Sequence, residues 1–233
     1  MIVLGIETAT TVCGAALVVD GVVVTESSIA EKNVHAEKLL TMVNAVLEKS
    51  GLALTKVSGI AISIGPGSFT GLRIGLSVAK GLSYATGIPL VAVPTLEALA
   101  RRLTAMHPIG NPGYVLPMID ARRDEVYCQL FRLEGEEAEQ VWEERDRTLS
   151  EVLAELRGIS VTVTGDANEK LKDWLIAGGM TERNGIAFAD TELSRCSAAT
   201  VALRGERLLQ ARQTEDPALL EPRYIKEFFF KSR

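Results

Sequence analysis

The sequence has few of the residues from which metal sites and disulfide frameworks are built. Its three cysteines (Cys13, Cys128 and Cys196) are widely spaced and include no C-x-x-C pair. This pattern excludes a disulfide framework and a cysteine zinc site, and it is typical of buried thiols in a reducing cytoplasm. The two histidines, His35 and His107, have no second ligand one helical turn away. We therefore expect no metal site and no cofactor.

Long hydrophobic runs and an excess of positive charge are also missing. No apolar stretch reaches the ~18 residues of a membrane helix, so we expect no membrane contact. The N-terminal apolar run has no basic residues before it and meets Glu7 at once, which does not fit a signal peptide. The net charge of −5 argues against a protein that grips nucleic acid unaided, although it allows a subunit beside a basic partner.

The first half of the chain alternates between strand and helix patterns. Asp20-Gly21 between valine runs predicts a two-residue hairpin turn, and Asn33 is a candidate N-cap. Thr95 is a second candidate cap. Strands are expected at 2–6, 12–19, 22–24, 57–64 and 89–93, and helices at 36–50, 68–85 and 96–103.

The second half repeats this order after a run of helix breakers at 107–113. The acids Glu7 and Asp120, and the turn glycines Gly21 and Gly135, are separated by almost the same number of residues. This spacing predicts one unit used twice, giving lobes at 1–107 and 108–233. Thr148 opens a capping box. Strands are expected at 114–119, 126–133, 140–147, 161–164 and 186–188, and helices after residue 148, at 168–177 and at 198–211.

A glycine-rich stretch at 63–87 begins at the end of an apolar run, breaks at Gly65-Pro66-Gly67 and then takes on helical spacing. Small residues recur at every fourth position, so one side of the predicted helix allows another backbone to approach closely. Because the helix is apolar almost all round, the close neighbour is either its own sheet or a partner. Gly65-Pro66-Gly67-Ser68 before the helix is either a structural turn or a weak phosphate cradle.

The chain resembles the TsaB (YeaZ) family, non-catalytic paralogues of the TsaD family. The motifs that carry the resemblance are L-G-I-E-T-A-T at 4–10, G-P-G-S-F-T-G-L-R-I-G at 65–75, A-V-P-T-L at 92–96, I-D-A-R-R-D-E-V-Y at 119–127 and E-P-R-Y-I-K at 221–226. The resemblance implies an α/β, actin/Hsp70-like (ribonuclease H-like) fold with duplicated β-β-β-α-β-α-β-α lobes. It also implies a scaffold subunit of the complex that forms N6-threonylcarbamoyladenosine in tRNA.

Compared with the catalytic paralogues, the chain lacks reactive groups. Thr95 and Leu99 stand where those proteins have an H-x-x-x-H metal pair, and Thr11-Val12 where they have an acidic pair. We expect no catalytic residue, and a vestigial cleft marked by Glu7, Asp120 and Arg122. A glycoprotease-like metallopeptidase and a small-molecule kinase of the same fold group are the alternatives.

The resemblance further implies partners: a TsaD-like catalytic subunit, a TsaE-like ATPase, tRNA indirectly through the complex, and a second copy of the chain when it is alone. The expected interface lies on the helices at 35–49 and 68–85, with Gly75→Leu expected to abolish pairing but not folding. Its residues are Leu39, Val43, Val46, Gly71, Leu72, Ile74, Gly75, Val78, Ala79 and Leu82.

Three other features stay open at this level. His35 is expected to be a surface or capping residue. Arg73 is expected to pair with a partner's acid, or with Glu37 or Glu97 of its own lobe. The tail at 228–230 either docks on a partner or folds back on the chain.

Overall fold

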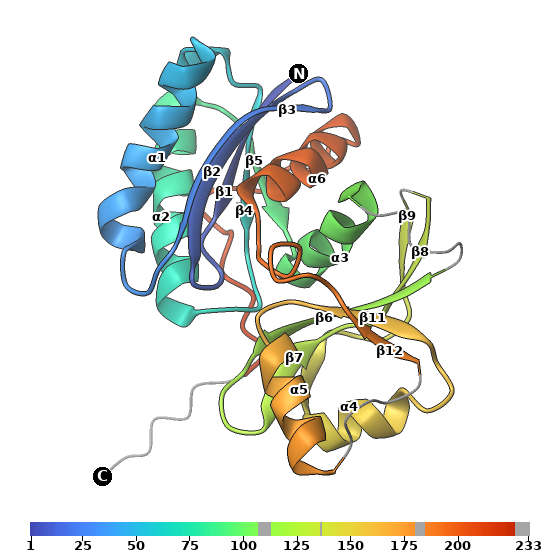
Figure 1. The fold of residues 1–233 in the computed structure, drawn as a ribbon. Helices are drawn as coiled ribbons and strands as arrows, with labels where there is room; N and C mark the ends of the chain where they lie inside the picture. Colours follow the sequence, from blue (N-terminus) through green and yellow to red (C-terminus); the bar gives the residue numbers. More distant parts are fainter. Residues whose placement is uncertain (107–112, 136, 180–184, 227–233) are drawn as a thin grey trace.

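The computed structural model describes residues 1–106, 113–135, 137–179 and 185–226, with the side chains of 104–106 left aside. The elements form five layers: two helices, a sheet, two helices, a second sheet and two helices (Figure 1). This is the mixed α/β architecture expected. The expected lobe boundary at 107 and the tail at 228–230 lie outside the described residues.

The first sheet has the strand order β3-β2-β1-β4-β5. β1 runs parallel to β4, which runs parallel to β5, whereas β2 and β3 are antiparallel additions. Asp20 and Gly21 both have positive φ (47° and 77°), which confirms the predicted hairpin turn. The strands are β1 (Ile2–Glu7), β2 (Val12–Val19), β3 (Val22–Ala30), β4 (Gly59–Ser63) and β5 (Leu90–Val93).

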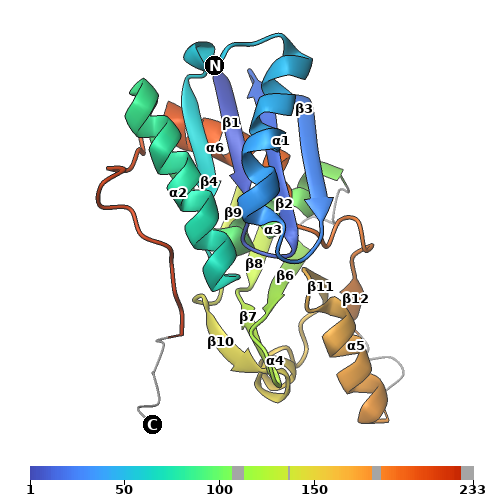
Figure 2. The ribbon, with the colours of Figure 1, turned by 90° about the vertical axis from the view of Figure 1, so that its left-hand side faces the viewer.

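Two helices, α1 (His35–Ser50) and α2 (Phe69–Thr86), cover one face of this sheet (Figures 1 and 2). The predicted Asn33 cap is wrong, because Asn33 takes a left-handed φ of 65° and the N-cap is Val34, which makes no side-chain hydrogen bond to the helix. Ser68 does cap α2, since its side chain accepts a hydrogen bond from the Gly71 N–H at 3.2 Å. A short 3-10 turn, η1 (Leu54–Lys56), connects α1 to β4.

The last helix, α6 (Ala198–Gln210), covers the opposite face of the first sheet. Its small residues fit small residues of the strands: a Cβ on Gly5 would overlap Ala198 and Ala202, and one on Gly205 would overlap Ala61. The assignment of all of 108–233 to the second lobe therefore does not match the packing, because α6 lies on the first sheet.

The second sheet is built on β6 (Gly113–Asp120), and its central strand order is β10-β7-β6-β11-β12, with β8 and β9 off this path. The single strand expected at 126–133 is interrupted at Gln129-Leu130, although both pieces keep one continuous register against β6. The strand expected at 140–147 is also divided, because residue 140 ends β9 and residues 145–147 belong to β10. The remaining strands are β7 (Glu125–Cys128), β8 (Phe131–Glu134), β9 (Glu137–Gln140), β10 (Arg145–Thr148), β11 (Val161–Thr164) and β12 (Ile186–Phe188).

Helices α4 (Leu149–Glu155) and α5 (Asn168–Ala177) pack on the outer face of the second sheet. The predicted capping box is confirmed: Thr148 accepts from the Glu151 N–H, and the Glu151 carboxylate accepts from the Thr148 N–H.

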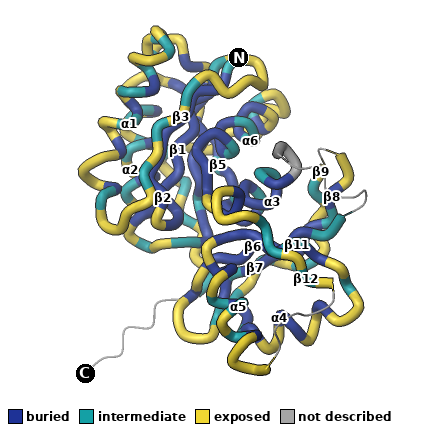
Figure 3. Tube along the Cα trace, in the orientation of Figure 1, coloured by how far each residue is buried: buried dark blue, intermediate teal, exposed yellow. Residues whose placement is uncertain are grey.

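The inner face of the second sheet meets α3 (Thr95–Met106) in an apolar layer between the lobes. Leu96 and Leu99 from α3 pack there with Val115 and Ile119 from β6, and all four are almost fully buried. Figure 3 shows buried stretches in both elements. Successive residues of β6 point alternately to this layer and to the opposite face of the sheet, as in any β-strand. Among the helices of the described ranges, none is long and apolar enough to cross a lipid bilayer.

Candidate partner-binding face and vestigial cleft

Glu7 ends β1 and is fully buried. Its Oε1 accepts a hydrogen bond from the Ala9 N–H at 2.6 Å, whereas Oε2 has no hydrogen-bond partner among the described residues. Burial raises the pKa of Glu7 to about 7, and the hydrogen bonds from the Ala9 N–H and the Ser63 hydroxyl only partly oppose this. Near neutral pH a large fraction of this carboxyl group is therefore protonated, which does not suit a nucleophile.

Asp120, at the matching end of β6, has a different environment. It is exposed, and its Oδ1 accepts hydrogen bonds from the Lys170 ammonium at 2.6 Å and from the Arg122 N–H at 2.9 Å. Arg122, the third residue of the expected cleft, takes part in this contact through its backbone N–H. Glu7 is enclosed and Asp120 is solvated, so the two acids are not equivalent groups of one open cleft.

Thr95 and Leu99, the positions compared above with an H-x-x-x-H metal pair, are used for packing. Thr95 is fully buried and its Oγ1 accepts from the Gly65 N–H at 3.1 Å, while Leu99 belongs to the layer between the lobes. Among the residues that the structure describes, no three histidine, cysteine or acidic side chains gather as metal ligands would. Thr95 and Leu99 are thus both packed inside the chain.

The loop before α2 has the geometry of a structural turn. The Ser68 N–H donates to the Ala9 carbonyl oxygen at 2.6 Å, and a Cβ on Gly67 would overlap the same carbonyl. A phosphate in this loop would compete with those contacts. Of the two interpretations of Gly65-Pro66-Gly67-Ser68, the geometry favours the turn.

His35 and the cysteines near Glu7 are structural. His35 is buried, and its Nε2 lies 3.1 Å from the Thr10 carbonyl oxygen and 3.2 Å from that of Val12, so this nitrogen serves as a donor to the start of β2. The expected surface position of His35 is therefore wrong. Burial raises the pKa of Cys13 to about 11 and that of Cys196 well above its usual value, so neither is a ready nucleophile.

The glycine stripe of α2 faces its own lobe. A Cβ on Gly71 would overlap the Thr8 carbonyl oxygen, and one on Gly75 would overlap the Thr8 hydroxyl and approach Ile62. Direct contact of the stripe with a partner is therefore contradicted. Of the expected interface residues, those buried in their own lobe are Leu39, Val43, Val46, Gly71, Leu72, Gly75 and Ala79.

Other residues of α1 and α2 are less buried. Ile74, Val78 and Leu82 are half-buried, while the Leu40 and Tyr84 side chains are 53% and 92% exposed. The two helices are in contact and lie side by side on one side of the first lobe (Figure 2). Leu40 and Tyr84 were missed from the sequence because helical spacing alone does not say which of several apolar stripes faces out.

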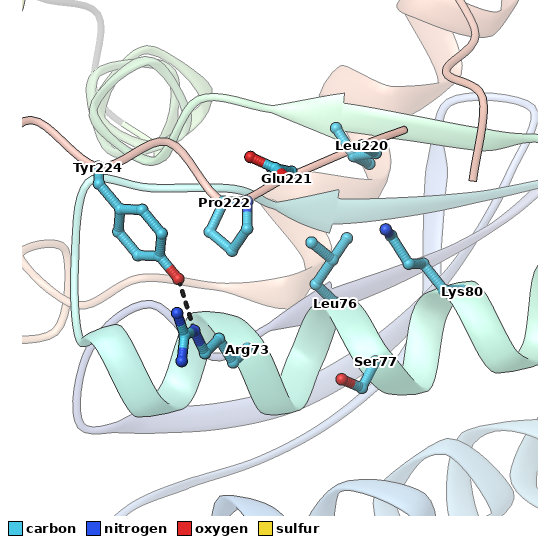
Figure 4. A pocket seen from close by; sticks show the side chains of 8 residues that line it. All are labelled: Arg73, Leu76, Ser77, Lys80, Leu220, Glu221, Pro222 and Tyr224. Carbon is cyan, nitrogen blue, oxygen red and sulfur yellow. Dashed lines mark hydrogen bonds between the residues drawn. The ribbon is translucent and has the colours of Figure 1, made fainter. Parts of the chain in front are cut away.

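A groove of about 380 Å³ runs along α2 beside the C-terminal segment (Figure 4). Arg73 does not pair with Glu37 or Glu97, as one alternative expected. Its Nε donates to the Tyr224 hydroxyl at 2.9 Å, and its guanidinium lies 3.7 Å from the Phe69 ring centre. The groove is lined by Arg73, Leu76, Ser77, Lys80, Leu220, Glu221, Pro222 and Tyr224.

Solved structures of known proteins have the same fold as this chain. The solved structure titled YeaZ from Pseudomonas aeruginosa superposes with a TM-score of 0.78 at 28% identity, covering 96% of this chain and 99% of that one. A hexokinase of the ROK group from Thermus thermophilus, at 13% identity and a TM-score of 0.51, shares the fold alone. The fold is therefore the actin-like one that the motifs imply.

Sequence comparison identifies the family. The model of the family TsaD, described as tRNA N6-adenosine threonylcarbamoyltransferase, matches residues 23–226. The tRNA threonylcarbamoyladenosine biosynthesis protein TsaB of Escherichia coli K12 is 33% identical over 200 residues, which cover 83% of this chain and 80% of that protein. The chain belongs to the TsaB (YeaZ) family, within the wider group that the TsaD model describes.

Proposed function

We propose that the chain is a non-catalytic scaffold subunit of the machinery that makes threonylcarbamoyladenosine in tRNA. It pairs with a TsaD-like catalytic subunit, helps to recruit a TsaE-like ATPase, and meets tRNA only through the complex. The observation that carries the proposal is the state of the vestigial cleft. Glu7 is enclosed with a raised pKa, and Thr95 and Leu99 are packed away.

The proposed partner-binding face is the outer surface of α1 and α2. Leu40 of α1 and Tyr84 of α2 expose apolar surface on these helices, and Val78 and Leu82, on other sides of α2, are half-buried. Large exposed side chains on rigid, adjacent helices lose little conformational freedom when they are covered, which suits stable pairing. In the absence of the catalytic subunit, the same face pairs two copies of the chain.

Charge-introducing variants test this face. Leu40→Asp and Tyr84→Asp place a carboxylate in the proposed contact, and each is expected to weaken co-purification with the TsaD-like subunit at least tenfold, about 1.4 kcal/mol or more. Ile176→Asp is the matched control, because Ile176 is 62% exposed on α5 of the other lobe. All three variants should keep the melting temperature of the unmodified chain. Unchanged pairing by both α1 and α2 variants would contradict the proposed face.

The activity is tested by reconstitution. tRNA modification by the TsaD-like and TsaE-like proteins should require this chain and should be retained by Cys13→Ala, which removes a buried thiol. Peptidase and sugar-kinase assays with added metal separate the alternatives; turnover in either would overturn the scaffold proposal.

A further inference from the structure

The C-terminal segment 215–226, called the strap below, first follows the edge of the first lobe. The Glu215 N–H donates to the Leu90 carbonyl oxygen at 2.9 Å, and Leu220 packs on the core between the sheet and α2. Further on, the Arg223 N–H donates to the Ile64 carbonyl oxygen at 2.7 Å. Gly65 has a φ of 117° and no room for a Cβ beside the Arg223 carbonyl, so this loop is shaped to receive the strap.

The next residues of the strap bind the second lobe. The Arg223 Nε lies 2.9 Å from Oε2 of Glu144, in the loop between β9 and β10, and the Glu144 side chain is only 4% exposed. The Lys226 ammonium donates to the Ala121 carbonyl oxygen at 3.2 Å and forms an ion pair with Glu125 of β7. The backbone of Arg223 is thus held by one lobe while its side chain is held by the other.

Between these two contacts, Tyr224 turns back to α2. Its ring lies 5.0 Å from that of Phe69, and its hydroxyl accepts the hydrogen bond from Arg73 described above (Figure 4). Figure 2 shows the strap passing down the side of the first lobe next to α2 and continuing to the second lobe. Within a few residues, the strap therefore contacts the first lobe, the second, the first again and then the second.

We propose that the strap is an internal cross-link that fixes the angle between the two lobes. Two-lobed proteins with a cleft commonly change this angle when a ligand enters. Here a segment of the chain itself supplies contacts to both sides, and no ligand is needed. Without Arg223, the buried Glu144 carboxylate loses its cation, and separation of the lobes on this side would return it to water.

Distance measurement between spin labels tests the cross-link in the full chain. The labels are placed on Glu48→Cys in α1 and Asp173→Cys in α5, both exposed, while the three natural cysteines are buried. Labelled protein is diluted with excess unlabelled protein, so that distances between copies do not contribute. The unmodified strap should give one narrow distance distribution. Arg223→Ala should broaden that distribution about twofold or shift it.

Controls separate the cross-link from a general loss of structure. Arg145→Ala removes an arginine that pairs only with Glu143 of its own lobe among the contacts of the described residues, and it should leave the distribution narrow. Adding Glu144→Gln to Arg223→Ala removes the buried charge and should restore most of the narrow distribution. Lys226→Ala is the second strap variant if Arg223→Ala fails to fold. A narrow, unshifted distribution for both strap variants would overturn the proposal, whether or not the TsaD-like partner binds.

Discussion

Replacing Glu7 by glutamine should remove a large pH dependence of stability. The pKa of Glu7 is about 7 in the folded chain against 4.5 for the free side chain. The folded state therefore holds a proton that the unfolded state releases, so the free energy of unfolding falls as pH rises from about 4.5 through about 7 and then levels off. Each pH unit between these two pKa values lowers the free energy of unfolding by roughly 1.36 kcal/mol, so the total loss is about 3 kcal/mol.

Urea unfolding between pH 4.5 and 8.5 measures this effect, with the variant and the unmodified chain compared at each pH. Glutamine keeps an oxygen that can accept the hydrogen bond from the Ala9 N–H and has no charge to lose. The stability difference should therefore change by about 3 kcal/mol in favour of Glu7→Gln across this range. Glu143→Gln, at an exposed carboxylate, is the control and should show little pH-dependent difference. Parallel curves for Glu7→Gln and the unmodified chain would refute the reasoning.

Two further predictions concern folding. Gly75→Leu should destabilise the chain by more than about 3 kcal/mol, because the new side chain has no room beside Thr8 and Ile62; thermal melting measures this, and a folded Gly75→Leu chain that fails only in pairing would show that the stripe faces a partner. Thr148→Ala should cost about 1 kcal/mol through loss of the α4 cap, as measured by urea unfolding, whereas Ser150→Ala, within the first turn of the same helix, should be close to neutral.

Local patterns predicted those features that neighbouring residues decide. The hairpin turn at Asp20-Gly21, the α5 boundaries and the Thr148 capping box need only the chemistry of a few adjacent residues. The interruption at Gln129-Leu130 was missed, because Gln129 and Leu130 fit the strand pattern and the break depends on the two pieces pairing with different neighbours, β10 and β9.

Long-range placement could not be predicted from such patterns. The helix α2 is apolar on several sides, so the sequence could not decide whether Gly71 and Gly75 meet their own β1 end or a partner. The position of α6 on the first sheet depends on matching small residues far apart in the chain, Gly5 with Ala202 and Ala61 with Gly205. The exposure of Tyr84 depends on which side of α2 packs on the sheet, and the contacts of the strap depend on how the two lobes are placed. Neither could therefore be predicted from local patterns.

The return of α6 to the first sheet has a consequence for biosynthesis. The strands β1 to β5 leave the ribosome long before the helix that covers one of their faces, so Val3 and Val91 stay uncovered while the second lobe is made. The second lobe is in this sense an insertion into the first, and it can complete its own core earlier. A nascent chain halted before residue 198 should therefore bind chaperones through this bare sheet, and release should coincide with the emergence of α6.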